Sequence, residues 1–107
     1  MTDAVTRVVE ALNAHDLDAF VACYAEDATI DDGDDNVFAR GHDELRTRYG
    51  ALFERFADVR VEALARVDVG AFVVVHERVT GRAPEAEFHV AVYQVRDGVI
   101  ARERLFR

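Results

Sequence analysis

The segment Ala86–Phe106, AEFHVAVYQVRDGVIARERLF, decides the fold class of this 107-residue chain. Residues 86–96 and 99–106 both have the periodicity of a strand. Asp97-Gly98 between them is a strong hairpin signal, because both residue types tolerate the positive φ that a two-residue turn requires. The segment therefore predicts two antiparallel strands joined by a tight turn.

The residues before this hairpin continue the pattern. Residues 59–67 alternate between apolar and charged side chains, as in a strand with one buried face. After a turn at Val69-Gly70, residues 71–80 are expected to form a second strand. The next turn, residues 81–84, holds the only proline, where it removes no hydrogen bond from a strand. Short connections between consecutive strands predict a four-stranded antiparallel meander.

The first half of the chain has helical periodicity instead. Apolar residues recur at the i, i+3, i+4, i+7 spacing of one helix face. Three groups show this spacing: Val5, Val8, Val9 and Leu12; Leu17, Phe20, Val21 and Tyr24; and Leu45, Tyr49, Leu52, Phe53 and Phe56. Thr2 or Asp3 can cap the first helix, and Asp16 the second. Three helices followed by strands make the predicted fold class α+β.

A short strand and an acidic loop are expected between the second and third helices. Ala28-Thr29-Ile30 is interpreted as the strand, and Asp31–Asn36 as a turn-rich loop. The order of its acids does not match an EF-hand, so we interpret it as a solvated loop rather than a metal site.

Composition restricts the class of protein further. The length suits one domain, residues 1–107. The net charge of −8 disfavours nucleic acid as a partner, because phosphate binding needs a basic patch. The longest apolar run, Ala71–Val75, is far too short to span a membrane, and no basic leader precedes it, so a cytoplasmic protein is expected. The single cysteine, Cys23, is interpreted as a small core residue.

Several motifs resemble a known family. Residues 10–20, EALNAHDLDAF, and residues 24–29, YAEDAT, are similar to the opening of SnoaL-like and ketosteroid-isomerase-like proteins of the nuclear transport factor 2-like superfamily. GHDEL at 41–45 and YQVRDGVI at 93–100 resemble later parts of the same family. The resemblance implies a curved sheet wrapped around helices, forming a cone with an apolar pocket. It implies little about chemistry, because members include isomerases, dehydratases, cyclases, epoxide hydrolases and plain binding or dimerisation modules.

The two hairpins assign a face to each strand residue. Positions that sum to about 195 should pair across Asp97-Gly98, and positions that sum to about 166 should pair across Gly81. A slip of one residue would reverse these faces. The expected pocket face carries Glu77, His89, Tyr93, Arg102 and Arg104. The resemblance implies the same parity, with Ala91, Tyr93, Arg102, Arg104 and Phe106 in the pocket; we expect Tyr24, Tyr49 and Phe53 to complete its lining.

Each polar group on this face has two interpretations. Glu77 and His89 form either an acid–base pair or a structural ion pair. Arg102 and Arg104 either hold a ligand carboxylate or enolate, or lie at the mouth of the cone as solubilising charges.

The resemblance also implies a general base at Asp32, with Asp31 as a substitute. The isomerase's oxyanion donors would fall at Val8 and Ala91, which cannot donate a hydrogen bond. Steroid isomerisation by that mechanism is therefore not expected. Replacement donors would be Tyr24, Tyr49, Tyr93 and His89.

Two functions remain open from the sequence. The first is an isomerase, cyclase or dehydratase acting on a small hydrophobic carbonyl compound, with Asp32, His89 and Tyr93 in catalysis. The second is a non-catalytic ligand-binding or dimerisation module. No zinc spacing, phosphate loop or dinucleotide motif is present, so no metal or cofactor is expected. An apolar outer sheet face predicts a homodimer; its residues are Phe72, Val74, His76, Val90 and Val92.

Overall fold

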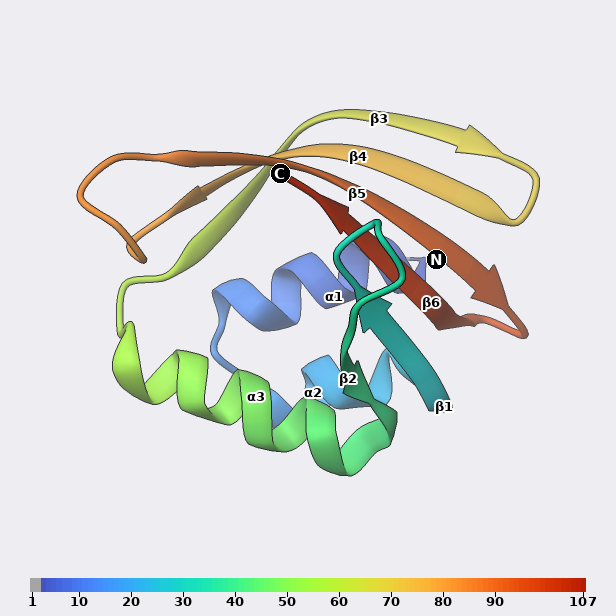
Figure 1. The fold of residues 1–107 in the computed structure, drawn as a ribbon, viewed down its shortest axis with the longest axis horizontal. Helices are drawn as coiled ribbons and strands as arrows, with labels where there is room; N and C mark the ends of the chain where they lie inside the picture. Colours follow the sequence, from blue (N-terminus) through green and yellow to red (C-terminus); the bar gives the residue numbers. More distant parts are fainter. Residues whose placement is uncertain (1–2) are drawn as a thin grey trace.

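A computed structural model describes residues 3–107 (Figure 1). Its helices are α1 (Ala4–Asn13), α2 (Leu17–Ala22) and α3 (Gly41–Arg55). Its strands are β1 (Tyr24–Asp31), β2 (Val37–Arg40), β3 (Arg60–Val69), β4 (Phe72–Thr80), β5 (Glu87–Arg96) and β6 (Val99–Phe106).

The helix caps follow from short acidic side chains. The carboxylate of Asp3 accepts the backbone N–H of Thr6 at the start of α1. Asp16 does the same for the N–H of Ala19 at the start of α2. The alternative cap, Thr2, lies outside the described residues.

All six strands form one sheet in the order β2-β1-β6-β5-β4-β3. The expected meander of four strands is present as β3 to β6, and the short strand expected at 28–30 lies within β1. The sheet is not antiparallel throughout. β1 pairs with β6 in parallel, and β2 pairs antiparallel with β1. The helical spacing had assigned Tyr24 to the second helix, whereas α2 ends at Ala22 and Tyr24 begins β1.

The register between β4 and β5 is the predicted one. Glu77 pairs with His89, Val75 with Ala91 and Val73 with Tyr93. These pairs occupy the concave face, which the helices cover.

The register between β5 and β6 changes partway along the hairpin. Next to the turn, Val95 pairs with Ile100, whose numbers sum to 195 as expected. Beyond a bulge at Ala101 the sum becomes 196, so that Tyr93 pairs with Glu103. A bulge inserts one residue into one strand and thereby exchanges the faces of all later residues. The predicted pocket positions of Arg102, Arg104 and Phe106 are therefore wrong.

A second bulge divides β3. Ala63 pairs with Glu77, but the next pair joins Ala65 to His76, so Leu64 is the extra residue. Val61 consequently faces the concave side, and Val67 faces the convex side. The alternation from 59 to 67 is real, but it does not belong to one face.

The three helices pack against the concave face of the curved sheet (Figure 1). The core lies between these layers and contains Val5, Phe20, Ile30, Leu45 and Ile100, all fully buried. The convex face of β3 to β6 carries no helix, and several large apolar side chains are exposed there. No helix within residues 3–107 is long and apolar enough to cross a membrane.

Candidate functional site

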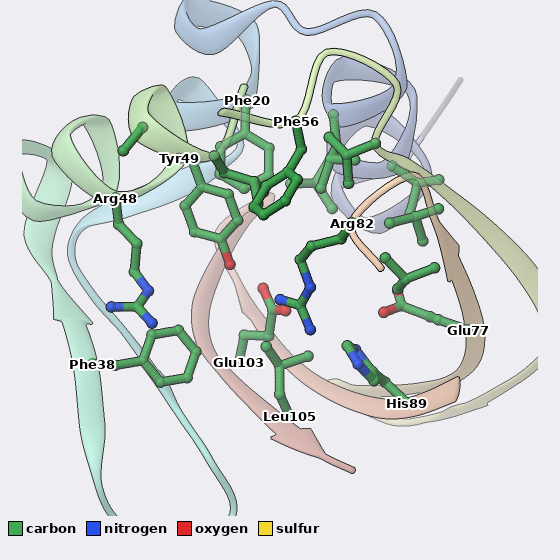
Figure 2. Close-up of a pocket in the computed structure, with 18 of the residues that line it drawn as sticks. Phe20, Phe38, Arg48, Tyr49, Phe56, Glu77, Arg82, His89, Glu103 and Leu105 are labelled. Atoms are coloured by element: carbon green, nitrogen blue, oxygen red, sulfur yellow. The ribbon is translucent and has the colours of Figure 1, made fainter. Parts of the chain in front are cut away.

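A cavity of about 670 Å³ lies between the helices and the concave face of the sheet. Its volume is in the range of small-molecule sites. Figure 2 shows side chains from α2, β2, α3 and the later strands directed into this space. Apolar and aromatic residues form most of the wall: Val8, Val9, Leu12, Phe20, Phe38, Leu52, Phe56, Val59, Val61, Val79 and Leu105.

Two tyrosine–glutamate pairs lie in this apolar surrounding. The Tyr24 hydroxyl donates to Oε1 of Glu103 at 2.5 Å. The Tyr93 hydroxyl donates to Oε2 of Glu77 at 3.0 Å. All four side chains line the cavity and are at least 95% buried. The local cause is the strand alternation, which directs residues 77, 93 and 103 to the concave face.

The two glutamates have strongly raised pKa values. Burial raises the pKa of Glu103 to about 8, Glu77 adds to this through charge repulsion, and the Tyr24 hydrogen bond lowers it only in part. Burial raises the pKa of Glu77 to about 7, against a smaller lowering by the Tyr93 hydrogen bond. Both carboxyl groups therefore change protonation near neutral pH, as acid–base catalysts do.

Tyr49 supplies a third hydroxyl from α3. Its ring packs against Phe20 with the centroids 4.4 Å apart, which fixes the side chain in the cavity wall. The hydroxyl makes no hydrogen bond to any other residue in the described part of the chain. Burial raises the pKa of Tyr49, so this hydroxyl keeps its proton and is available as a donor.

His89 lies beside these groups on β5 and is 7% exposed. Its Nε2 is buried without a hydrogen-bond partner among residues 3–107. Burial lowers the pKa of the imidazole, with further lowering by the nearby cations Arg107 and Arg82. His89 is therefore neutral at neutral pH. The expected pairing with Glu77 exists in the strand register, but the two side chains are not hydrogen-bonded.

Several predicted site residues lie in the cavity lining: Tyr24, Tyr49, Glu77, His89 and Tyr93. Their chemical roles stay predictions. Phe53 does not line the cavity; its ring stacks on His15 at 4.8 Å. Phe106 is exposed on the convex side, against Gly33.

Asp32 is also outside the cavity, which contradicts its expected position. It lies in the exposed loop after β1, where its carboxylate accepts the backbone N–H of Asp34 and the side-chain amide of Asn36. A carboxylate that caps its own loop in solvent cannot reach a ligand in the cavity.

Arg102 and Arg104 bind protein carboxylates on the convex side instead of a ligand. Both donate to the fully buried carboxylate of Asp31, at 3.0 and 3.1 Å, and both also reach Asp35. Burial alone would raise the pKa of Asp31, but the N–H of Gly33 and the two guanidinium groups outweigh it and lower the pKa. This cluster connects β1 to β6 and has a structural role.

Glu103 was not predicted as a site residue. It lies between two arginines in the sequence, so its immediate neighbours are all charged. Leu105 and Phe106 are apolar but point to opposite faces of the strand, so periodicity could not assign a face to Glu103. The bulge at Ala101 decides that assignment, and no sequence pattern in β6 marks it. Arg48 and Arg82 also line the cavity. They were not predicted because arginines in a polar helix and in a turn are usually solvent-exposed.

The cavity thus combines two buried carboxyl groups, Glu77 and Glu103, with three tyrosines and a neutral histidine within a mainly apolar wall. Such an arrangement can transfer protons to and from an organic molecule. Within residues 3–107, no three His, Cys, Asp or Glu side chains are grouped closely enough to hold a metal ion.

Solved structures share this architecture, a cystatin-like fold with a curved sheet over helices. A cystatin-fold protein from Novosphingobium aromaticivorans has a TM-score of 0.90 at 26% identity, with 97% of this chain and 95% of that chain covered. A candidate polyketide cyclase from Sinorhizobium meliloti has a TM-score of 0.85 at 24% identity, covering 98% and 94%. A protein from Catenulispora acidiphila with a ketosteroid isomerase-like fold, in complex with trimethylamine, has a TM-score of 0.81 at 16% identity, covering 97% and 84%.

The chain belongs to the SnoaL-like domain family, whose model matches residues 5–103. No curated protein matches it.

Proposed function

We propose that this protein is an acid–base enzyme that isomerises, cyclises or dehydrates a small hydrophobic carbonyl compound in the cavity. One observation carries the proposal: two buried glutamates, Glu77 and Glu103, face the cavity with pKa values of about 7 and about 8. An apolar binding cavity without catalytic function gains nothing from two such carboxyl groups, because their burial costs free energy. Structural neighbours that are candidate polyketide cyclases support a carbonyl substrate.

The pKa difference assigns a role to each glutamate. Glu77 ionises first and is the base that removes a proton from the carbon next to the carbonyl. The C–H electron pair then forms the carbon–carbon double bond of the enolate, and the negative charge moves to the oxygen. Glu103 keeps its proton to higher pH and donates to this oxygen, assisted by the Tyr49 hydroxyl. Returning the proton to a different carbon completes an isomerisation, whereas attack of the enolate carbon on a second carbonyl completes a cyclisation.

A binding module is the second candidate, and the positions of Val8 and Ala91 favour it. Both lack a hydrogen-bond donor where the isomerase pattern has one. Tyr49 and Glu103 are the groups that replace those donors in the enzyme proposal.

Proton exchange tests the enzyme proposal without knowledge of the natural substrate. The probe is 2-tetralone, whose α-protons exchange slowly with deuterium in D₂O and can be followed by NMR. We expect the wild-type protein to accelerate exchange above buffer, and Glu77→Gln to reduce the acceleration about 100-fold or more, the usual contribution of a general base. Glu103→Gln should also reduce it, because the enolate loses its proton donor.

Asp32→Asn is the matched control, since it removes a carboxylate outside the cavity and should leave the rate unchanged. Exchange that is no faster than buffer, for 2-tetralone and for an acyclic β-diketone, would contradict the enzyme proposal. A rate that Asp32→Asn lowers and Glu77→Gln does not would contradict the assignment of the base.

A further inference from the structure

The cavity contains an unused hydrogen-bonding atom close to its mouth. His89 is 7% exposed and lines the cavity, yet its Nε2 has no partner in the described part of the chain. A buried polar atom without a partner costs free energy, so such atoms in native proteins have a reason. Here the ring is part of the cavity wall, so a bound ligand is the group that can supply the missing bond.

Two cations flank this imidazole. Arg82, in the turn between β4 and β5, lines the cavity, and Figure 2 shows it and His89 directed into the same space. Glu103 and Leu105 of β6 line the cavity, and so does Arg107, which directly follows the strand. Arg107 and Arg82 both lower the pKa of His89, which is consistent with their lying near it.

Arg82 still has free hydrogen-bonding capacity. Its Nε and Nη2 donate to Glu87 at 2.9 and 2.7 Å, which orients the guanidinium group rigidly. Its Nη1 makes no hydrogen bond to another described residue. Glu87 therefore positions Arg82 and leaves one edge of the guanidinium for a ligand.

The charge of the lining is opposite to that of the whole chain. The arginines that line the cavity are Arg48, Arg55, Arg82 and Arg107. Apart from Glu77 and Glu103, the acids that line it are Asp43 and Glu44. The chain as a whole carries a net charge of −8. Arginines thus outnumber Asp43 and Glu44 in the lining by four to two, and a neutral ligand would gain nothing from this positive charge.

We propose that His89, Arg82 and Arg107 bind the carboxylate of an amphipathic organic acid, whose apolar body occupies the space between Phe56, Val79 and Leu105. In the tautomer that carries its proton on Nε2, the neutral imidazole is a donor, as is the free edge of Arg82, and a carboxylate accepts from both. A hydroxyl or amide would satisfy His89 but bring no negative charge to Arg107, or to the edge of Arg82 that Glu87 leaves free. For the carbonyl end of the ligand, the inference rests on the proposed function. Together the two make the substrate class a hydrophobic keto acid.

The test compares two probes that differ only in charge, 2-naphthoate and 2-naphthamide. Their dissociation constants are measured by isothermal titration calorimetry at pH 6.5, where the naphthoate is ionised. We expect naphthoate to bind at least tenfold more tightly, the effect of a hydrogen bond to a charged group. Arg82→Gln and His89→Leu should each reduce the affinity for naphthoate about tenfold and leave the affinity for naphthamide within twofold of wild type.

Arg78→Gln is the control, because Arg78 is an exposed arginine on the convex face of β4, outside the cavity. Should either cavity variant unfold, Arg82→Lys keeps the charge and should retain part of the preference. Equal affinity for the two probes, or no binding of naphthoate at millimolar concentration, would overturn the proposal. Since this is a binding measurement, it can fail while proton exchange still depends on Glu77, and it can succeed when exchange is absent.

Discussion

The buried carboxyl group of Glu103 destabilises the fold when it is ionised, and the same burial gives it the raised pKa that the proposed chemistry uses. Its carboxyl group is 5% exposed, bonded only to the Tyr24 hydroxyl, and free of any cationic partner in the described structure. A structural carboxylate such as Asp31, by contrast, has two arginines. A carboxyl group therefore has a raised pKa at Glu103 in the cavity and a lowered pKa at Asp31 in the ion cluster, because the surroundings of the two groups differ.

The first prediction at this scale concerns Glu103→Gln and pH. The folded-state pKa of about 8 lies above the ordinary value of 4.5. Below pH 4.5 the carboxyl group is protonated in both the folded and the unfolded state, so its ionisation does not change the free energy of unfolding. As pH rises from 4.5 to about 8, the unfolded state releases a proton that the folded state keeps, so the free energy of unfolding falls. Glu103→Gln should remove this loss and be more stable than wild type by roughly 2–4 kcal/mol at pH 8.5, with little difference at pH 4.

Urea denaturation followed by circular dichroism at both pH values measures this effect. Glu85→Gln, in the exposed turn before β5, is the control and should leave the profile unchanged. A Glu103→Gln protein that is less stable than wild type at pH 8.5 would show that the ionised carboxylate contributes favourably to folding.

Each site residue could be predicted only where the strand pairing before it is regular. Glu77, His89 and Tyr93 follow from the β4–β5 hairpin, which has no irregularity from Phe72 to Val79. Arg102 and Arg104 could not be placed, because the single extra residue Ala101 exchanges the faces of everything after it. Asp32 was placed by resemblance, which aligned its position in the chain but not the direction of its side chain.

At the scale of elements, the turn between β4 and β5 packs closely against the backbone of the segment that connects α3 to β3. Gly81 has φ +85°, and a Cβ there would lie 2.2 Å from the carbonyl oxygen of Asp58 and 2.8 Å from the nitrogen of Val59. Val59 lines the cavity, and Arg82 directly follows Gly81. Close backbone contact at this glycine thus positions two parts of the site at once.

The second prediction follows from this contact. Gly81→Ala should lower the free energy of unfolding by about 2–4 kcal/mol, because the backbone is left-handed and the added carbon meets main-chain atoms that cannot rotate away. Gly70→Ala is matched to it: φ is +57° and no atom lies within 4 Å, so only about 1 kcal/mol is expected. Thermal denaturation of both variants measures the difference. Equal losses would mean that the backbone around Asp58 moves to admit the methyl group.

The elements that sequence reasoning recovered are those with one clear period. The three helices and the strands β4 to β6 have it, and β3 has it on each side of its bulge. Of β1, only residues 28–30 were predicted as strand, and β2 was missed. In β1, Glu26 and Asp27 are exposed in the middle of the strand, and in β2 only Ala39 is fully buried. Tyr24 satisfies the helical spacing of α2, but pairing with Ile100 of β6 holds it in the sheet.

At the scale of the whole molecule, the convex face of the sheet is an apolar surface without a covering layer. Phe72 is 46% exposed and Phe88 is 54% exposed, and Val67, Val69, Val90 and Phe106 are exposed with them. We propose that a second copy of the chain covers this face, because a two-fold pairing lets one apolar surface meet itself.

The third prediction is therefore a homodimer. Sedimentation velocity at micromolar concentration should give twice the mass of the chain, and Val90→Arg should give a monomer with an unchanged circular dichroism spectrum. Glu54→Arg, at an exposed position on α3, should leave the dimer intact. A monomeric wild-type protein at 100 micromolar would exclude this pairing.

The position of β6 between β1 and β5 has a consequence for biosynthesis. A ribosome releases the strands in chain order, so β1 and β2 cannot join the sheet of β3, β4 and β5 until residues 99–106 emerge. Tyr24 must then find Glu103, 79 positions further along the chain. Contacts of such long sequence separation form late and slowly. The strand that completes the cavity is also the strand that completes the fold, and a nascent chain passes through a stage in which the edges of β1 and β5 that face β6 are both unpaired.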